Sequence, residues 1–316
     1  MIDEVREEHA LHELIERYFR VSFTTENPVI TQAVTKMLAA GGKRLRPRLT
    51  LLSVRACGGN PEGALHLAAY MELIHVATLI HDDVVDGAAM RRGVNATAVD
   101  FGNRTSVLAG DYLFAWIFKN VTANYPPPIP HVLSATLAAI CDGEVLQLHA
   151  LGNLDVRLHD YVEIARKKTA SLFAAAAECG AIVARGDRAQ TDALRTFGER
   201  YGIAFQMRDD LLDLTAESGS LGKPVHGDLL EHKMTAPLIL ALEGGDEALR
   251  GDVEALFSGA EIPVARVAQA VERQGGAART KIEIARWVRL AEDALEPLPA
   301  GAAKERLSGL ARRLVE

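Results

Sequence analysis

In the segment LIHDDVVDG, residues 79–87, an apolar helical pattern runs into three carboxylates. The apolar letters have the spacing of a mostly buried helix, and Gly87 is typical of the residue that ends one. Asp82, Asp83 and Asp86 crowd the last turn, where the helix C-terminus already carries partial negative charge. Carboxylates are unfavourable there unless a cation offsets them. The segment therefore predicts a helix that ends at a cation-binding site.

The same aspartate spacing returns in QMRDDLLD, residues 206–213, as Asp209, Asp210 and Asp213. On a helix, the first and third aspartates of each triplet share one face, and the middle one lies at its flank. A solvated acidic face would explain one such triplet. Two triplets, each late in an otherwise apolar helix, favour divalent cations, and Mg²⁺ binds through one or two carboxylates plus substrate phosphates. The pair predicts magnesium held with a phosphate-bearing ligand.

Helical signals extend along the chain, and strand signals are almost missing. Asn27-Pro28 is typical of a helix start, and Gly41-Gly42 of the break that follows. Asp160 and Glu163 resemble a capping box at the start of an alanine-rich helix. Further long helices are expected over about 190–215 and, as peripheral helices without a motif, over 245–316. We expect one all-α domain over residues 1–316.

The composition indicates a soluble globular protein of 316 residues, 48% hydrophobic and 24% charged. A net charge of −7 argues against nucleic acid as a partner. Three scattered cysteines do not suit a disulfide framework, which favours the cytoplasm, and the acidic N-terminus is unlike a signal peptide. The longest uncharged run, residues 120–141, holds four prolines, so we expect no transmembrane segment.

Basic residues follow chain breaks or stand beside the acidic triplets, where they could bind a diphosphate. They are Lys43, Arg44, Arg46 and Arg48 in GGKRLRPR, Arg91 and Arg92, Lys167 and Lys168, Lys223 and Lys233. Each alone would be ordinary surface charge. His75 lies two helical turns before Asp82 on the same face, where its ring nitrogen could donate to a phosphate, although a lone histidine there is more often a core residue.

Taken in order, the motifs GGKRLRP, LIHDDVVD with RRG, KKTA, and GIAFQMRDDLLD before GKP and HKMTAP resemble those of the trans-isoprenyl diphosphate synthases, or polyprenyl synthetases. The resemblance covers about residues 27–240. It implies a helical bundle around a central cavity, usually a homodimer, that condenses isopentenyl diphosphate head-to-tail with an allylic diphosphate. The chain departs from the family where His232 replaces a frequent glycine before Lys233.

The resemblance also implies roles for individual residues. Magnesium ions would be held by Asp82, Asp83, Asp86, Asp209, Asp210 and Asp213. The allylic diphosphate would be contacted by Arg91, Lys168, Thr169, Gln206, Lys223 and Lys233, and the diphosphate of isopentenyl diphosphate by Lys43, Arg46, His75 and Arg92. Asp82, Asp86, Asp209, Lys168 and Lys233 are the expected catalytic residues, because they would stabilise the charge of the departing diphosphate.

Product length should depend on the helix below the first triplet. In the family, bulky aromatic residues at the fourth or fifth position before the first aspartate stop growth early, and here these positions hold Thr78 and Ala77. Ile74 continues the same face as a moderate block. We expect a product longer than geranylgeranyl diphosphate, made from a starter such as farnesyl diphosphate. Trp116 or Phe118 would form the pocket floor, or else belong to the ordinary core.

Other functions remain open at the level of the sequence. A farnesyl or geranylgeranyl diphosphate synthase would share every motif, and the chain could be the catalytic subunit of a heteromer. A class I terpene cyclase would share the first acidic motif, but GGKRLRP and the second triplet argue against it. A purely structural acidic helical protein is the remaining alternative.

Overall fold

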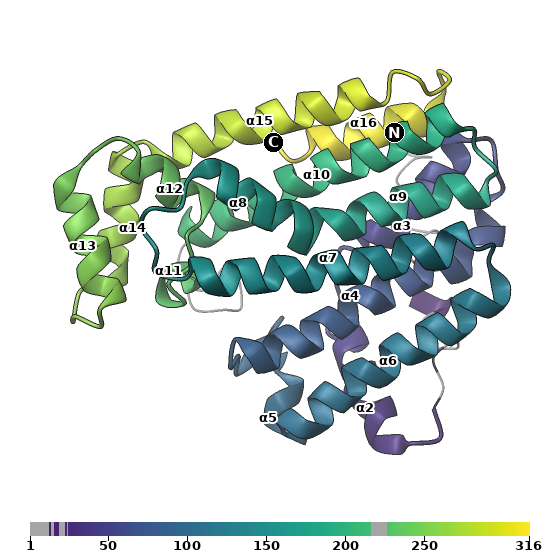
Figure 1. Cartoon of the computed structure of the whole chain (residues 1–316), viewed down its shortest axis with the longest axis horizontal. Helices are drawn as coiled ribbons and strands as arrows, with labels where there is room; N and C mark the ends of the chain where they lie inside the picture. The colour runs from purple at the N-terminus through teal and green to yellow at the C-terminus, as the bar shows by residue number, and fades with distance from the viewer. Residues whose placement is uncertain (1–12, 14–15, 19–22, 24, 216–225) are drawn as a thin grey trace. The chain divides into compact units, whose positions relative to one another are not determined.

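The computed structural model describes residues 13, 16–18, 23, 25–215 and 226–316. Throughout this part the chain is helical apart from one short hairpin, which confirms the predicted all-α class (Figure 1). The chain divides into two compact units. Unit 1 comprises Met1–Ser134 and Ala175–Asp192, and unit 2 comprises Ala135–Ala174 and Ala193–Glu316. The expectation that the whole chain forms one domain stays a prediction.

Unit 1 contains the first acidic triplet. Its complete elements are α2 (Pro28–Ala39), α3 (Leu45–Ala56), η1 (Pro61–Ala64), α4 (Leu65–Val85), β1 (Met90–Arg91), β2 (Val94–Asn95), α5 (Thr97–Phe101) and α6 (Asn103–Asn124). The predicted start of α2 is confirmed, because the side chain of Asn27 accepts hydrogen bonds from the backbone N–H groups of Val29 and Ile30.

Helix α4 forms the core of unit 1, packing chiefly against α6 and α3. Its residues Leu67, Met71, Ile74 and Ile80 are fully buried. The close approach of α6 requires Gly110, since a Cβ atom there would lie 2.3 Å from the ring of His81. Burial of α4 on most sides explains why its sequence is apolar almost all round, with polar residues at its C-terminal end.

Unit 2 contains the second triplet and the C-terminal helices. Its elements are most of α7 (Pro128–Ala150), α8 (Leu158–Ala165), η2 (Arg166–Ala170), the start of α9 (Ser171–Val183), most of α10 (Arg188–Thr215), α11 (Gly227–Leu230), α12 (Ala236–Leu242), α13 (Glu247–Phe257), α14 (Val264–Arg273), α15 (Gly276–Ala294) and α16 (Ala302–Arg312). The segment η2 is one turn of π-helix between α8 and α9, and such turns are frequent at functional sites.

The start of α8 differs in detail from the expected capping box. The helix begins at Leu158, and Asp160 lies inside its first turn, where the carboxylate accepts a hydrogen bond of 3.0 Å from the backbone N–H of Arg157. Glu163 instead accepts two hydrogen bonds from the guanidinium of Arg166. The reason is local: Asp160 occupies the third helical position, from which a carboxylate reaches back to the chain before the helix.

An aromatic cluster forms much of the core of unit 2. The ring of Phe173 lies 5.2 Å from that of Tyr201 and 5.3 Å from that of Phe205. Gly198 and Gly202, one turn apart on α10, allow this packing, since a Cβ at either position would lie 2.5 Å from the backbone of Phe173 or Ala170. Helix α10 therefore packs closely against η2 and the start of α9.

The C-terminal helices attach to this core rather than forming a separate body. Helix α12 packs on α15, and the guanidinium of Arg200 on α10 donates a hydrogen bond of 2.6 Å to the backbone oxygen of Leu290 on α15. The prediction of helices over 245–316 is confirmed by α13 to α16.

Two helices of the described chain are long and apolar enough to cross a membrane by length and composition. In Pro61–Val85, which joins η1 and α4, 67% of the apolar window is buried within the protein, as expected of a core helix. In Pro128–Ala150 only 22% of the apolar window is buried.

The prolines of the uncharged run separate α6 from α7 as expected. However, Pro128 and Pro130 lie in the first turn of α7, where proline is tolerated, and do not interrupt it.

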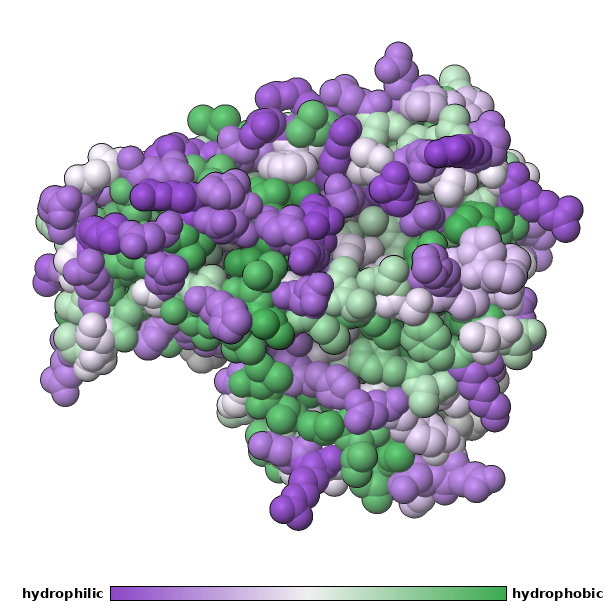
Figure 2. Space-filling view, in the orientation of Figure 1, coloured by the Kyte–Doolittle hydropathy of each residue, from purple (hydrophilic) through white to green (hydrophobic). Residues whose placement is uncertain are grey.

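Several apolar side chains are exposed on these helices. Figure 2 shows hydrophobic residues gathered over α6 and over α7. On α6 they are Val107, Leu108 and Tyr112, and on α7 they are Val145, Leu146 and Leu148. Contiguous exposed apolar residues of this kind mark surfaces that contact another molecule.

Candidate active site

The first triplet lies where the sequence predicts it, at the C-terminal end of α4, but its three aspartates differ in their surroundings. Asp83 is fully buried, and its Oδ1 accepts hydrogen bonds from the guanidinium of Arg91, with Nε at 2.6 Å and Nη2 at 2.5 Å. Asp82 and Asp86 are half-buried on the neighbouring face. The middle aspartate therefore holds an arginine from a buried position, whereas the outer two are more accessible to solvent.

The hairpin after α4 presents the two arginines of RRG. Arg91 pairs with Val94 across β1 and β2, and the two-residue turn is Arg92-Gly93. Both turn residues have positive φ, 51° and 78°, as a tight turn of the type I′ class requires. The guanidinium of Arg92 then donates to the backbone oxygen of Gly41. The turn thus brings Arg92 to the GGKR loop.

The GGKR loop is shaped by glycine and by one buried arginine. A Cβ on Gly42 would lie 2.8 Å from Nη1 of Arg92, so glycine permits the close approach of that side chain. Arg44, with φ of 47°, caps α3 and is buried, and its guanidinium donates to Glu72 at 2.8 Å. Lys43 is exposed on the loop, and Arg46 is half-buried in the first turn of α3.

His75 lies on the half-buried face of α4 among these arginines. Burial and the positive charges of Arg46 and Arg92 hold the pKa of His75 well below its usual range. The ring is therefore neutral at physiological pH, with one N–H donor available to a phosphate oxygen. The structure thus groups Arg46, His75 and Arg92, with Lys43 on the adjoining loop, and their binding of isopentenyl diphosphate stays a prediction.

The second triplet, at the C-terminal end of α10, is also divided. Asp209 is exposed. Asp210 is buried and accepts hydrogen bonds from the hydroxyl of Tyr161 at 2.6 Å and the amide of Gln206 at 2.8 Å. Asp213 accepts from the backbone N–H groups at the start of α11, those of Gly227 and Asp228. The middle aspartate is again the buried, hydrogen-bonded member of the triplet.

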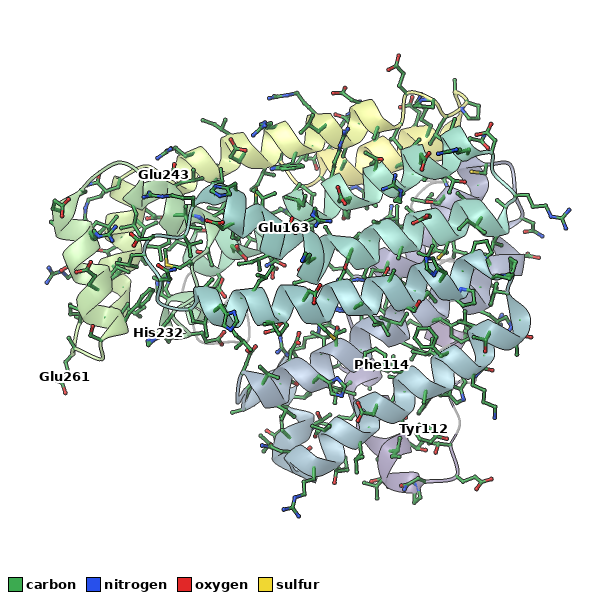
Figure 3. The ribbon with its side chains drawn as sticks, viewed as in Figure 1. Tyr112, Phe114, Glu163, His232, Glu243 and Glu261 are labelled. Atoms are coloured by element: carbon green, nitrogen blue, oxygen red, sulfur yellow. The ribbon has the colours of Figure 1, made fainter. Side chains whose placement is uncertain are left out.

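Hydrogen bonds connect this triplet to the KKTA motif. The Thr169 hydroxyl donates to Oε1 of Gln206 at 2.6 Å, and Gln206 in turn reaches Asp210. Lys168 on η2 is paired with Glu144 of α7, and Glu163, labelled in Figure 3, pairs with Lys167 from α8 at 3.7 Å. Three of the predicted diphosphate-binding residues, Lys168, Thr169 and Gln206, are therefore adjacent parts of one arrangement.

Lys233 follows α11 beside the same carboxylates. Burial raises the pKa of both Asp210 and Asp228, and the positive charge of Lys233 offsets part of that rise. His232 has φ of 57°, a left-handed conformation that suits the glycine frequent in the family, and its ring, labelled in Figure 3, packs 4.9 Å from that of Phe257. The loop accommodates histidine without losing the lysine. Lys223 lies outside the described residues.

Two carboxylates of unit 2, those of Asp210 and Asp228, have raised pKa values because their charged forms are unfavourable there. Burial raises the pKa of Asp210 to about 6, and the nearby Asp209 contributes to the rise. Burial, Asp210 and Asp213 likewise raise the pKa of Asp228 well above its usual range. Across the part of the chain that is described, no three acidic, histidine or cysteine side chains gather closely enough to hold a metal ion by themselves. The aspartates of each triplet nevertheless suit Mg²⁺, because this ion takes only one or two carboxylates and completes its shell with water and phosphate.

The residues expected to control product length are placed differently from one another. Ala77 and Ile74 are fully buried in the core of unit 1. Thr78 is half-buried on the face of α4 that also carries His75 and Asp82. Trp116 is half-buried in unit 1, and its ring packs 5.3 Å from that of Phe23. Of these residues, Thr78 is the one on the same open face as the first aspartate.

Sequence reasoning did not find four residues that organise the site: Glu72, Glu144, Tyr161 and Asp228. Each is a buried or half-buried polar residue that contacts a predicted site residue or its loop. None of the four carried a recognisable signal in the sequence, because their partners are distant along the chain.

The chain is similar in sequence and in fold to known proteins. The family described as "Polyprenyl synthetase" matches residues 27–273. A short chain isoprenyl diphosphate synthase of Methanothermobacter thermautotrophicus is 37% identical over 310 residues, covering 96% of this chain and 95% of the relative. Heptaprenyl diphosphate synthase component 2 of Geobacillus stearothermophilus is 35% identical, covering 96% and 93%. The crystal structure of a decaprenyl diphosphate synthase from Rhodobacter capsulatus superposes with a TM-score of 0.89 at 36% identity, covering 99% and 97%.

Proposed function

The chain belongs to the polyprenyl synthetase family, and on that premise we propose how its residues divide the reaction between them. It is a transferase that condenses isopentenyl diphosphate with an allylic diphosphate to give a trans-polyprenyl diphosphate. Relatives that make heptaprenyl and decaprenyl chains support a product longer than geranylgeranyl. One relative of similar identity is a short-chain enzyme, which keeps product length as the property to measure first.

One observation carries the proposed assignment: both triplets have the same design. In each, the middle aspartate is buried and hydrogen-bonded to residues of the predicted binding set, Arg91 for Asp83 and Gln206 for Asp210. The outer aspartates Asp82 and Asp209 lie on more open faces. Structural acidic patches would not need this pattern, whereas metal-binding carboxylates with supporting neighbours do.

We assign magnesium ions to the outer aspartates of each triplet, Asp82 and Asp86 in unit 1 and Asp209 and Asp213 in unit 2, with the buried Asp83 and Asp210 as their supports. Bound magnesium would neutralise charge on the departing diphosphate of the allylic substrate. Lys168, Thr169, Gln206 and Lys233 would donate to the same leaving group, and Arg91, oriented by Asp83, would do so from the hairpin.

The second diphosphate belongs to Lys43, Arg46, His75 and Arg92. The neutral His75 ring and the arginines around it would hold isopentenyl diphosphate with its double bond near the allylic carbon. After the carbon–carbon bond forms, a proton leaves and the new double bond regenerates an allylic diphosphate. We assign the proton to the released diphosphate, because no side chain in the motifs stands out as a dedicated base.

Thr78 is the proposed control of product length. It lies under Asp82 on the half-buried face of α4, and its hydroxyl donates to the backbone oxygen of His75 at 2.8 Å. A helical turn rises about 5.4 Å, close to one extended isoprene unit, so each open turn should admit about one more addition. Ala77 and Ile74, being fully buried, would act through the packing behind Thr78.

We further propose a cytoplasmic homodimer. The exposed apolar side chains of α6, Val107, Leu108 and Tyr112, support an interface with a second copy. The relative named as component 2 of a heptaprenyl synthase supports a second candidate, in which this chain is the catalytic subunit of a heteromer. Sedimentation of the pure protein distinguishes these states when it is combined with activity measured for the protein alone.

The test is a product assay with labelled isopentenyl diphosphate, farnesyl diphosphate and Mg²⁺, followed by reversed-phase sizing. The expected result is a ladder that ends beyond geranylgeranyl. Replacing Asp82 or Asp209 by asparagine should reduce incorporation on the order of 10²-fold or more. A matched control is Asp142→Asn, an exposed aspartate of α7, which should change nothing. Folded protein that incorporates no label alone, but does so with a partner subunit, would replace the homodimer by the heteromer.

A further inference from the structure

A short acidic segment of α7 lies against the two lysines of KKTA. Asp142, Gly143 and Glu144 are consecutive on α7, and Lys167 and Lys168 are consecutive on η2. The ammonium of Lys167 lies 3.7 Å from the carboxylate of Asp142, and that of Lys168 is paired with Glu144. Each of the two lysines thus pairs with a different carboxylate of α7.

Gly143 determines how closely the two segments approach. A Cβ atom at this position would lie 2.5 Å from the backbone nitrogen of Lys168 and 3.0 Å from its Cα. Real Cβ atoms do not come so near to backbone, and η2 cannot yield easily because Gly202 of α10 packs against Ala170 on it. The absence of a side chain at Gly143 is therefore a condition for the present position of Lys168.

The two ion pairs differ in burial. The side chains of Glu144 and Lys168 are 16% and 19% exposed, whereas that of Asp142 is 70% exposed. An exposed pair is weakened by solvent and contributes little, while a largely buried pair is screened less and holds its geometry. Glu144 is thus the carboxylate that fixes a lysine, and Asp142 serves as its natural control.

We infer that Glu144 is a positioning residue for Lys168, with Gly143 permitting the contact. The inference rests on the proposed function, in which Lys168 donates to the leaving diphosphate. Thr169, the next residue, is held by Gln206 at 2.6 Å, so both donors of the motif are oriented before substrate arrives. Preorganised donors stabilise developing charge without reorganising during the reaction.

This role predicts a particular kinetic change. In Glu144→Gln the ammonium of Lys168 remains, but it is no longer held where the charge of the leaving group develops. The diphosphate of the bound substrate can still attract it, so KM for the allylic substrate should stay within about twofold of wild type. The kcat should fall on the order of tenfold, because an interaction specific to the transition state is weakened. The kcat of Glu144→Asp should lie between those of wild type and Glu144→Gln, and the kcat of Asp142→Asn should match that of wild type.

A second measurement does not depend on activity. Each folded protein is treated briefly with acetic anhydride, and the modification of each lysine is measured by mass spectrometry. An amine held against a largely buried carboxylate reacts slowly, so Glu144→Gln should increase acetylation of Lys168 roughly tenfold, as expected when a largely buried ion pair is lost. Lys167 should be unaffected. Asp142→Asn should leave Lys168 unchanged.

The outcomes separate the inference from the proposed function. Unchanged kcat together with unchanged acetylation of Lys168 in Glu144→Gln would overturn the positioning role. Equal losses in Glu144→Gln and Glu144→Asp with a lowered Tm would overturn it too, since they indicate a structural role alone. If the wild-type protein has no prenyltransferase activity, the proposed function fails, while the acetylation pattern still decides whether Glu144 holds Lys168.

Discussion

Replacing Arg44 by methionine should destabilise the protein by roughly 3–5 kcal/mol, the usual cost of removing one partner of a buried ion pair. The residue and Glu72 are each 2% exposed. The guanidinium donates to Glu72 at 2.8 Å, to Glu16 at 2.6 Å and to the backbone oxygen of Leu38 at 2.8 Å. Methionine keeps the volume but leaves a buried carboxylate and a backbone oxygen without this donor.

The assay is thermal unfolding followed by circular dichroism. For a chain of this size, about 2 °C is expected per kcal/mol, so the Tm should fall by roughly 6–10 °C. The double variant Arg44→Met with Glu72→Met removes both charges and should recover most of the loss, because a buried pair replaced by apolar residues is often neutral. Lys36→Met, which breaks the more exposed pair with Asp100, should leave the Tm nearly unchanged.

The same variant should weaken isopentenyl diphosphate binding, because Arg44 joins the GGKR loop to α4 one turn before His75. We expect a raised KM for isopentenyl diphosphate and little change in KM for the allylic substrate. A loss of less than about 1 kcal/mol, or a double variant no more stable than Arg44→Met, would refute the reasoning that this pair is mutually dependent.

Three further outcomes are expected. The folded pKa of His75 lies below its unfolded value near 6.5, so the free energy of unfolding is not reduced by this residue above that pH and falls as the pH drops below it, by at most about 1.4 kcal/mol per pH unit. His75→Gln should therefore narrow the Tm difference between pH 5 and pH 7. An unchanged difference would contradict this expectation. Thr78→Phe should shorten the product by sizing, and an unchanged ladder would remove Thr78 from the length-controlling face. Tyr161→Phe removes a hydrogen bond to the buried Asp210 and should lower the free energy of unfolding, measured by thermal unfolding, by about 1.5–3 kcal/mol. A decrease of less than a few tenths of a kcal/mol would show that the bond contributes nothing.

The sequence by itself determined the class of fold, the reaction and the two acidic triplets. These follow from local order along the chain: apolar periodicity makes the helices, and Asp82 and Asp209 take their helical faces from spacing alone. Asn27 capped α2 as predicted, for the same local reason. Asp160 was placed at the wrong capping position, because caps depend on which backbone N–H groups are left unpaired.

Only the tertiary structure decided which members of each motif are buried and hydrogen-bonded and which lie on more open faces. Asp83 and Asp210 look like their neighbours in the sequence, yet both are buried and hydrogen-bonded to other residues. Arg44 stands in a basic loop but serves as a buried link to Glu72. Glu144 carried no recognisable signal, since its partner Lys168 becomes its neighbour only through packing around Gly143. Such roles depend on burial and on partners far apart in the chain, and spacing along the sequence contains neither.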